Sequence, residues 1–343
     1  MKIRKSIILI TLCIASFSFG QTENENKKSD FTIAFGSCNK QQHPQPFWKE
    51  ILKNNPDVFI WGGDNIYGDS ANMTKKASDY HIQNKNRDYQ KVKKQVPVMA
   101  TWDDHDYGKN DSGAEWEMKK ESQQLFLDFL GVAKEDARRS QEGIYTSKVF
   151  KHAKGSIKVI ILDTRYFRSP LLKDSTGKKR YVPHTTGKGT ILGQKQWQWL
   201  ENELKSSTAD FNIIVSSIQF LSGEHGWECW ANFPGEIDRL QRLIIANKVK
   251  NVIILSGDRH ISEFSKTNLP DLPYPLIDFT SSGLTHAYTK YTGEPNQYRI
   301  GEVIAVPSFG ILNIDFDAKE SRMQIRGKDN VILQEIIQRY PKN

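Results

Sequence analysis

The sequence predicts an α/β protein in which two packed sheets are flanked by helices. Apolar runs rich in β-branched residues and closed by glycine are typical of buried strands, and they occur at Phe31–Phe35, Val58–Trp61 and Val252–Leu255. Helical patterns alternate with such runs over the first three quarters of the chain. The last quarter contains only strand-like runs. Alternating elements followed by a β-rich end indicate two sheets with helices outside.

The remaining elements follow in order along the chain. A helix is predicted over 46–55, because Pro46 is favoured at a helix start and an asparagine pair ends the pattern. Further helices are predicted over Glu115–Leu130, Gln194–Leu204 and Pro234–Ala246, and further strands over 96–102, 158–163, 211–217, 276–280, 300–306, 310–316 and 323–326, the last four as a meander. Segments 70–90 and 170–190 are lysine-rich, and the second contains glycine; both are expected to be solvated surface loops.

The first twenty residues are expected to be a signal peptide. A basic start containing Lys2 precedes an apolar stretch that is too short to span a bilayer, and Ser18 and Gly20 are the small residues before a cut at Gln21. An alternative lipoprotein signal through Cys13 is disfavoured because Leu12 stands where a small residue is expected. We therefore expect a periplasmic or secreted protein with a flexible lead-in at 21–30 and a single domain at 31–343.

The net charge is modest and does not indicate specific nucleic-acid binding. The formal net charge is +8, and three of the basic residues lie in the signal peptide, so the mature chain carries +5. Lysine and arginine are interleaved with acidic residues, which permits attraction to a small phosphoester substrate but predicts no specific nucleic-acid recognition. No second segment is long and apolar enough to serve as a transmembrane anchor, and a monomer is expected.

Two cysteines remain after export, Cys38 and Cys229. One interpretation is a disulfide, which an oxidising compartment allows. The interpretation that we favour is a metal-binding Cys38, because it directly follows a buried strand at the edge where the other polar loops converge. A thiolate suits iron or zinc.

Asp64 is the strongest candidate for a ligand that bridges two metal ions. It stands at the end of a buried strand in GGDNIYGD at 62–69, where an unpaired charge would be costly. Tyr67 follows three residues later and has a phenolate that favours Fe3+ over Zn2+ beside a thiolate. Its alternative is a packed aromatic ring. Two ions held in this way clamp a phosphoryl group for attack by hydroxide.

Asp258 and His260 are the next pair of candidate ligands, in LSGDRH at 255–260. Both can reach a metal ion only if the backbone leaves the sheet first, and Gly257 permits that turn. A histidine two residues after an aspartate at the end of a buried strand favours metal binding over a satisfied polar residue.

The segment TWDDHDYGKND at 101–111 contains too many acids for all of them to be ligands, because mutual repulsion would raise their pKa values. Asp104 is the candidate ligand of the second ion, and Asn110 offers a carbonyl oxygen to it. Oxygen ligands of this kind suit Ca2+ or Mg2+. His105 is the candidate to contact phosphate or to protonate the leaving oxygen, and the other acids orient it or cap a turn.

Two arginines follow the strand at 158–163. Arg165 and Arg168 are candidates to hold phosphate, with a surface ion pair as the alternative. Trp102, Trp227 and Trp230 are candidate pocket walls, with core packing as the alternative.

Taken together, these motifs resemble the PhoD-like alkaline phosphatases, a branch of the calcineurin-like metallophosphoesterases. The resemblance runs from Phe31 to about Phe264. FGSC at 35–38 stands where the wider superfamily has Asp-x-His. GGDNIYGD matches the segment that carries the family's bridging aspartate and iron-binding tyrosine. SGDRH stands where relatives carry Gly-His-x-His. The resemblance implies a four-layer α/β/β/α metallophosphoesterase sandwich of two mixed sheets flanked by helices.

The resemblance also implies a binuclear site. Fe3+ would be held by Cys38, Asp64, Tyr67 and His260, and Ca2+ or another divalent ion by Asp64, Asp104, Asn110 and Asp258. The sequence departs from the superfamily at 213–220, where no histidine supplies a further ligand and Gln219 or Ser217 is the candidate replacement.

The expected function is an exported metal-dependent phosphohydrolase, an alkaline phosphatase or phosphodiesterase that uses a metal-activated hydroxide. Asp64, His105 and Arg165 are its expected catalytic residues. The alternatives are a phospholipase-type phosphodiesterase acting on lipid head groups and a non-catalytic binding protein with the same fold.

Overall fold

The structure is a computed structural model that describes residues 29–342. The predicted signal peptide and most of the predicted lead-in lie outside these residues. No helix within 29–342 combines the length and the apolar character that crossing a membrane requires.

One of the two large sheets has six strands. They are β1 (Phe31–Gly36), β2 (Val58–Gly62), β3 (Val98–Thr101), β13 (Phe309–Asp315), β14 (Glu320–Arg326) and β15 (Ile332–Arg339). Their order in the sheet is β15-β14-β13-β1-β2-β3. The neighbours β1, β2 and β3 are parallel, and β13, β14 and β15 continue the sheet as antiparallel strands. The sheet is therefore mixed, and its parallel half carries the crossovers that position the site.

Those crossovers are helical. The helix α1 (Phe47–Leu52) connects β1 to β2, and α2 (Met73–Lys85) with α3 (Arg87–Gln95) connects β2 to β3. A short helix, α4 (Asp104–Tyr107), directly follows β3, and α5 (Lys119–Phe129) comes after it.

The second large sheet has seven strands. They are β4 (Thr146–His152), β5 (Gly155–Ile161), β8 (Phe211–Val215), β9 (Val252–Ser256), β10 (Ser262–Thr267), β11 (Leu276–Ser281) and β12 (Arg299–Ile304). Their order is β12-β10-β11-β9-β8-β5-β4, and the central strands β11, β9, β8 and β5 are parallel. The helices α6 (Gly193–Lys205) and α7 (Pro234–Ala246) supply crossovers on one face. A separate two-stranded ribbon consists of β6 (Leu172–Lys173) and β7 (Tyr181–Val182).

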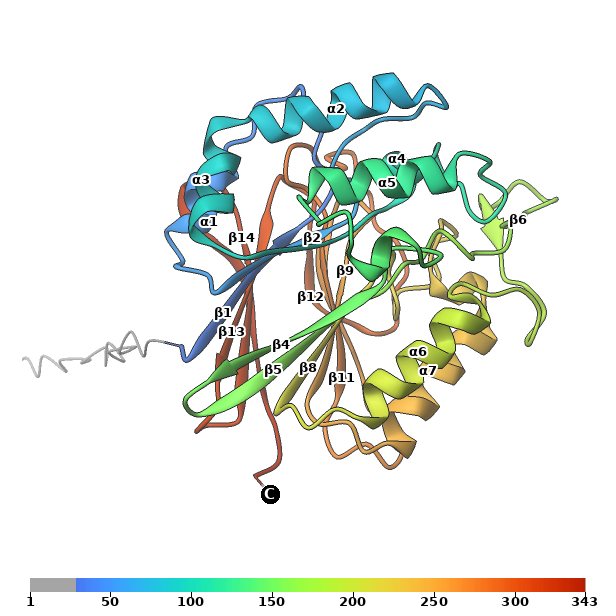
Figure 1. Ribbon diagram of the computed structural model, residues 1–343. Coiled ribbons are helices and arrows are strands. Elements are labelled where there is room, and N and C mark those ends of the chain that lie inside the picture. Colours follow the sequence, from blue (N-terminus) through green and yellow to red (C-terminus); the bar gives the residue numbers. More distant parts are fainter. Residues whose placement is uncertain (1–28, 343) are drawn as a thin grey trace, which may run out of the picture.

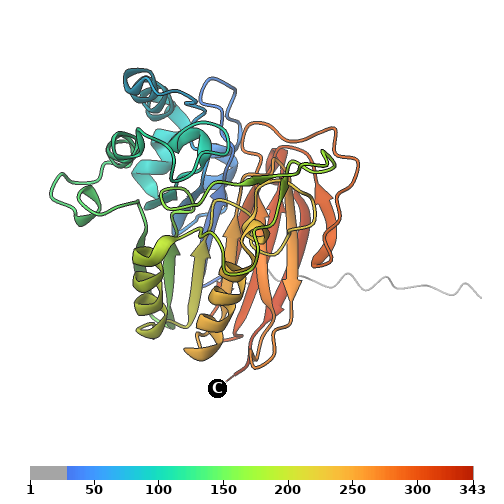
Figure 2. The ribbon, with the colours of Figure 1, turned by 90° about the vertical axis from the view of Figure 1, so that its right-hand side faces the viewer.

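The two sheets pack face to face with helices on both outer faces (Figures 1 and 2). The rings of Phe35 on β1 and Phe279 on β11 lie 4.7 Å apart across the interface. On the outer face of the six-stranded sheet, Trp48 of α1 contacts Phe59 of β2 at 5.4 Å. The helices α6 and α7 cover the seven-stranded sheet. The predicted four-layer α/β/β/α sandwich is confirmed.

The carboxyl ends of β1, β2, β3 and β9 meet at the same edge of the molecule. The backbone N–H of Cys38, after β1, donates to the carbonyl of Gly63, after β2, at 3.3 Å. A bridge between Ser37 and Ser282 links the ends of β1 and β11, which belong to different sheets. Parallel strands place their polar loops together in this way, and the loops carry the candidate ligands.

Three of the predictions for individual elements are wrong. Segment 70–90 is not a loop, because α2 and the start of α3 occupy it; the buried face of α2 consists of Lys76, Asp79, Tyr80 and Gln83, which hides the apolar pattern of a helix. The helix predicted from Glu115 begins at Lys119. The strand predicted over 300–306 pairs with β10 in the seven-stranded sheet, so the C-terminal strands form no single meander.

Candidate metal centre

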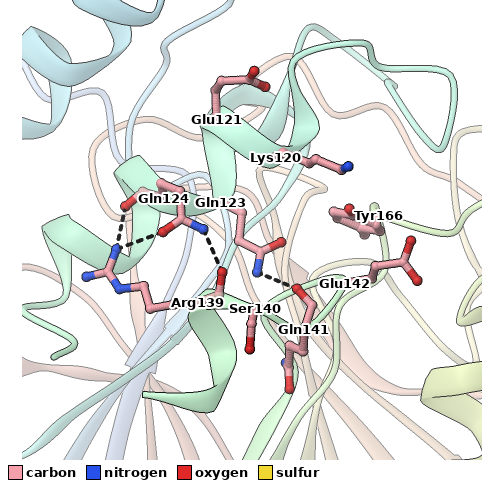
Figure 3. Close-up of a pocket in the computed structure, with 9 residues that line it drawn as sticks. All are labelled: Lys120, Glu121, Gln123, Gln124, Arg139, Ser140, Gln141, Glu142 and Tyr166. Carbon is pink, nitrogen blue, oxygen red and sulfur yellow. Dashed lines mark hydrogen bonds between the residues drawn. The ribbon is translucent and has the colours of Figure 1, made fainter. Parts of the chain in front are cut away.

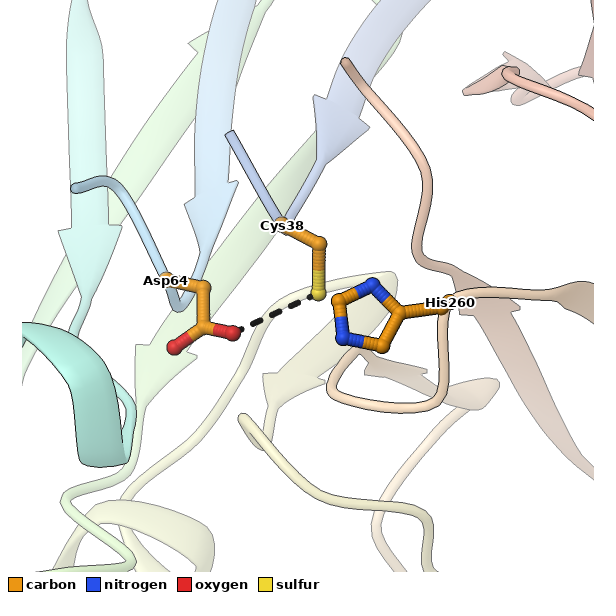
Figure 4. A group of neighbouring side chains, drawn as sticks. All are labelled: Cys38, Asp64 and His260. Atoms are coloured by element: carbon orange, nitrogen blue, oxygen red, sulfur yellow. Dashed lines mark hydrogen bonds between the residues drawn. The ribbon is translucent and has the colours of Figure 1, made fainter. Parts of the chain in front are cut away.

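Four predicted ligands from three separated segments meet at the end of β1. Figure 4 shows three of them, Cys38, Asp64 and His260. The Sγ atom of Cys38 lies 3.5 Å from Oδ2 of Asp64, and one ligand atom each of Cys38, Asp64 and His260 lies within 4.8 Å of the others. The hydroxyl of Tyr67 lies 3.5 Å from Nε2 of His260. A thiolate, a carboxylate, a phenolate and an imidazole thus surround one small space.

The backbone at these residues adopts a conformation that L-amino acids usually avoid. Cys38, Asp64, Asp258 and His260 have φ values of 60°, 50°, 69° and 54°. Each such residue costs of order 1–3 kcal/mol, and strain of this kind concentrates at functional sites. The fold holds these four side chains in their positions against an energetic cost.

Two glycines allow the strand ends to come this close. A Cβ atom on Gly63 would lie 2.7 Å from Cβ of Asp103, and one on Gly257 would lie 2.5 Å from Oγ of Ser37. Real Cβ atoms essentially never approach other atoms so closely. The glycines after β2 and β9 are therefore required for the ends of the two sheets to meet.

A second group of acids adjoins the first. Ligand atoms of Asp103, Asp104 and Asp258 lie within 4.8 Å of one another, and so do those of Asp64, Asp104 and His105. Asp64 therefore belongs to both the sulfur-containing group and the oxygen-rich group, as a bridging ligand would. Asn110 is exposed, and it is the following residue, Asp111, whose N–H donates to Oδ2 of Asp104 at 2.6 Å.

Burial without a cation makes Cys38, Asp64 and Asp258 retain their protons. The exception is Asp104: although burial opposes it, Arg165 and His105 lower the pKa of this carboxyl group to about 2. Burial raises the pKa of the Cys38 thiol to about 12. Burial, and then the neighbouring Cys38 and Asp104, raises the pKa of Asp64 well above its ordinary value, and burial with Asp103 and Asp104 does the same for Asp258. Burial lowers the pKa of His260 to about 4, which keeps its ring neutral, as metal binding requires. A bound cation would favour the charged forms of the three acids.

Unpartnered buried atoms also fit a metal ion. Among residues 29–342, Oδ1 of Asp64 and Nδ1 of His260 are buried without a hydrogen-bond partner. Buried polar atoms in native proteins almost always have partners, so these orphans require an explanation. The donor set of sulfur, phenolate oxygen, imidazole and carboxylate fits one softer and one harder ion side by side.

His105 lies next to Asp104 and Tyr67 at the edge of this centre. Its Nδ1 lies 2.7 Å from Asp69, and its ring packs at a tilt against Tyr67 with 4.2 Å between centroids. Although burial lowers it, Asp104 and Asp69 together raise the pKa of His105 above its ordinary value. A carboxylate behind a histidine orients the ring and favours its protonated form.

The buried lysine of α2 holds the segment that carries His105. Nζ of Lys76 donates to the backbone carbonyls of Asp106 at 2.7 Å and His105 at 3.3 Å. Burial lowers the pKa of Lys76 to about 8. The sequence did not predict a role for this residue, and its only signal was a lysine four residues before Tyr80 within a polar segment.

Arg165 and Arg168 are not available to hold phosphate. Arg165 is fully buried, and it donates to Asp103 at 2.6 Å and to Glu228 at 2.6 Å. Nε of Arg168 pairs with the other oxygen of Glu228 at 2.9 Å. The expectation that they grip substrate is corrected: their guanidinium groups are committed to buried carboxylates, and the partner Glu228 was missed because it lies in a loop without a recognisable pattern.

The candidate replacements for the missing histidine have other partners. The hydroxyl of Ser217 donates to Asp103 at 2.7 Å, and the amide nitrogen of Gln219 donates to Glu263 at 2.8 Å. Ser217 therefore supports Asp103 at the edge of the oxygen-rich group.

A further histidine that the sequence analysis missed reaches the centre from the loop after β11. The ring of His286 lies 4.4 Å from His260 and 5.2 Å from Tyr67 between centroids. In the same loop region, the hydroxyl of Ser282 lies 3.0 Å from Sγ of Cys38. The only sequence signal was the polar run after a buried strand, SSGLTH at 281–286.

Two of the three candidate tryptophans lie in the core, and both described cysteines are buried. Trp102 and Trp230 are fully buried in the core, whereas Trp227 is 38% exposed and lies under the guanidinium groups of Arg180 and Arg259. Cys38 and Cys229 are both free, so no disulfide joins them.

Two cavities differ in their relation to the centre. A cavity of about 620 Å³ is lined in part by Asn110, Asp111, Arg180 and Tyr181. Asp111 connects it to the centre, because its backbone N–H donates to Asp104. A second cavity of about 430 Å³, between α5 and the segment 139–142, contains no candidate ligand (Figure 3). Several of its polar side chains pair locally, such as Arg139 with Gln124, so we regard it as a surface depression.

The chain is similar in sequence and in fold to known proteins. Alkaline phosphatase D of Bacillus subtilis (strain 168) is 25% identical over 281 residues, which cover 69% of this chain and 48% of that protein. The chain thus spans about half the length of this curated relative.

The fold is also found in solved structures. A structure described as that of PhoD superimposes with a TM-score of 0.70 at 18% identity, covering 90% of this chain and 70% of the other. A dimetal phosphatase from Danio rerio gives a TM-score of 0.55 at 12% identity, covering 91% of this chain and 100% of the other. Finally, the family model described as PhoD-like phosphatase matches residues 33–302. Because this match covers well over half of the chain, the protein belongs to the PhoD-like phosphatase family.

Proposed function

We propose that the chain is an exported metal-dependent phosphohydrolase that cleaves phosphomonoesters or phosphodiesters of small molecules. The single observation that carries the proposal is that Asp64 belongs to two adjacent ligand groups, one with sulfur and one rich in oxygen. Two ions that share a carboxylate are the arrangement that clamps a phosphoryl group. The family match and the alkaline phosphatase D relative support the same reaction class.

The donor chemistry suggests which ions these residues would hold. Cys38, Asp64, Tyr67 and His260 suit Fe3+, whereas Asp64, Asp104 and Asp258 suit Ca2+ or another divalent cation. Asn110 remains a proposed ligand from the rim of the oxygen-rich group. When bound, the two ions would polarise the phosphoryl oxygens and acidify a water molecule.

The side chains of the chain itself would perform the proton transfer and the positioning. His105, oriented by Asp69, donates a proton to the leaving oxygen of the ester. Arg165 does not touch the substrate in this proposal and acts instead as a positioning residue, because it fixes Asp103 beside Asp104 and Asp258. The cavity of about 620 Å³ beside Asp104 would accept the alcohol part of the ester.

The test compares a chromogenic diester, bis(p-nitrophenyl) phosphate, with p-nitrophenyl phosphate. The mature chain from Gln21, with measured Fe and Ca contents, is compared with Asp64→Asn and with the surface control Asp88→Asn. We expect turnover that falls by roughly 10²–10³-fold or more in Asp64→Asn, the scale of losing one preorganised electrostatic group. Equal turnover in wild type and Asp64→Asn would refute the proposal, and the ratio of the two substrates' rates ranks diesters against monoesters.

A second candidate is hydrolysis of lipid head groups. Exposed apolar side chains occur on the ribbon strand β6 and on two loops, namely Leu172, Trp227 and Tyr288, which are 42%, 38% and 40% exposed. Such a rim can contact a lipid surface. Release of head groups from phosphatidylcholine vesicles, lost when Leu172 and Trp227 are changed to Ser, would support this candidate, and inactivity on vesicles together with turnover of small esters would exclude it.

A further inference from the structure

The arginines around the centre are already neutralised by carboxylates. Arg165 and Arg168 pair with Asp103 and Glu228, Arg180 pairs with Asp111 at 2.5 Å, and Arg259 pairs with Glu294 at 2.7 Å. A phosphoester carries negative charge on its non-bridging oxygens, and donors in reach of those oxygens would stabilise it. Any such cation must therefore come from elsewhere in the chain.

Lys40 is a cation beside the centre that has no carboxylate partner among residues 29–342. It lies two residues after Cys38, is half-buried, and holds its Nζ 5.1 Å from the centroid of the Tyr67 ring. The backbone around it is fixed, because its N–H donates to the hydroxyl of Thr285 at 2.8 Å. An ammonium group held over an aromatic ring keeps its full charge and its donors for an anion.

His286 approaches the same place from the other sheet. Its ring lies 5.2 Å from Tyr67 and 6.2 Å from His43, and its Nδ1 lies 3.0 Å from the hydroxyl of Thr285. The Thr285 hydroxyl, which has one proton, also lies 3.2 Å from the carbonyl oxygen of Cys38 and can donate to it instead. His286 has the Nε2–H that an anion requires in the tautomer in which the hydroxyl donates to Nδ1. Thr285 thus ties Lys40 and His286 together, since it contacts both.

We propose that Lys40 and His286 form an anion subsite on the Tyr67 side of the centre that binds phosphoryl oxygens of the substrate. Two residues from separate sheets, joined through Thr285, supply an ammonium group and a ring N–H next to a candidate iron ligand. The identity of the anion as a phosphoryl group rests on the proposed function. The bound oxygens belong either to the reacting phosphoryl group or to a second phosphate of the same substrate.

The experiment measures the dissociation constants of inorganic phosphate and pyrophosphate by calorimetry on metal-loaded protein. The variants are Lys40→Gln, Lys40→Arg and His286→Ala. Two matched controls have the same chemistry elsewhere: Lys93→Gln, whose Nζ lies 5.8 Å from the Tyr89 ring, and His152→Asn, whose ring stacks on Phe316 at 5.6 Å. The Fe content and visible absorption of every variant are recorded, because a loss of metal would shift both.

We expect Lys40→Gln to weaken phosphate binding at least about tenfold, the scale of one hydrogen bond to a charged group, with unchanged iron absorption. His286→Ala should weaken it less, and Lys40→Arg should restore it to within about threefold of wild type because the charge is kept. Equal weakening for both anions assigns the subsite to the reacting phosphoryl group. Weakening for pyrophosphate alone assigns it to a second phosphate.

Three results would overturn the inference. The first is a Lys40→Gln variant that binds both anions with wild-type affinity, and the second is a Lys93→Gln variant that loses as much affinity as Lys40→Gln. The third is a wild-type protein that carries both metals but binds neither anion. The proposed function fails separately, if the wild type binds phosphate in a Lys40-dependent manner yet hydrolyses no ester.

Discussion

Two buried acidic clusters lie side by side in this protein, and each accommodates its negative charge differently. In the first, Asp103 and Glu228 are neutralised within the chain by the guanidinium groups of Arg165 and Arg168. In the second, no lysine or arginine of residues 29–342 forms an ion pair with Asp64 or Asp258. The first cluster is complete in the folded chain, whereas the second is complete only with cations from solution.

The difference shows which acids support structure and which await a ligand. Burying a carboxylate is expensive unless it is paired and hydrogen-bonded. Arg165 and Arg168 meet that requirement for the first cluster. Burial alone would lower the pKa of Arg165, but Asp103 and Glu228 outweigh burial and raise it above its ordinary value. For the second cluster the requirement is met by protonation in the metal-free chain and by metal ions in the loaded chain. Matched isosteric substitutions in the two clusters should therefore have opposite effects.

The largest effect is expected from Glu228→Gln in the first cluster. The amide cannot neutralise Arg165 and Arg168, so the free energy of unfolding should fall by roughly 3–5 kcal/mol, the range for a broken buried ion pair. Iron and calcium contents of the protein that remains folded should stay close to wild type. Chemical denaturation together with metal analysis measures both quantities. A stable variant that loses its metals would show that Glu228 belongs to the second cluster instead.

The matching change in the second cluster is Asp258→Asn. It removes a carboxylate whose pKa burial raises, so the metal-free protein should lose no stability and even gain some. With metals supplied, kcat/KM should fall by about 10²–10³-fold, the range for losing one preorganised electrostatic group. Denaturation in the presence of a chelator and kinetics in the presence of metals separate the two effects. Destabilisation of the chelated variant would contradict the comparison.

Metal removal should lower the free energy of unfolding by somewhat less than Glu228→Gln does. An ion present at 100 to 1,000 times its dissociation constant stabilises the native state by about 2.7–4.1 kcal/mol. A metal ion must displace the proton of Cys38, whose pKa burial raises to about 12, so its stabilising effect should grow as pH rises from about 6 to about 8. Thermal unfolding with and without chelator at both pH values tests this, with Cys38→Ser as the variant that should lose much of the difference.

The sequence allowed the second cluster to be predicted more fully than the first. Cys38, Asp64 and Asp258 each follow a buried strand directly, and the carboxyl ends of parallel strands meet at one edge, so their proximity follows from the chain order. Glu228 and His286 lie in long loops whose paths are set by tertiary contacts. The partner of Arg165 is 63 positions away, and no local pattern signals such a pair. The helix α2 was missed because its buried face is polar, and with it Lys76, which holds the His105 segment.

A third buried carboxyl group, that of Asp278, lies outside the site. Within residues 29–342 it has no arginine partner and belongs to no candidate metal site. Asp278 on β11 accepts hydrogen bonds from the N–H groups of Phe220 at 2.8 Å and Leu221 at 2.9 Å and from the hydroxyl of Ser256 at 2.6 Å. These donors offset burial only in part, because burial still raises the pKa of Asp278 to about 6. The three hydrogen bonds therefore do not fully offset the cost of burying this carboxylate.

The smallest effect is expected from Asp278→Asn, and its sign depends on pH. Because the folded pKa of about 6 exceeds the ordinary value of 3.8, the folded state holds the proton more tightly than the unfolded state does. The contribution of Asp278 to stability is full below about pH 4 and is lost as pH rises through about 6. The uncharged variant lacks this loss, so at pH 8 it should equal or exceed the wild type by about 1–2 kcal/mol, less than the full value of a two-unit shift. Urea unfolding of both proteins at pH 5 and pH 8 decides the question, with Asp271→Asn, a change at an exposed acid, as control. The opposite result would be a variant whose free energy of unfolding, relative to wild type, is lower at pH 8 than at pH 5. It would mean that the three hydrogen bonds suffice to hold the charged form without a cation.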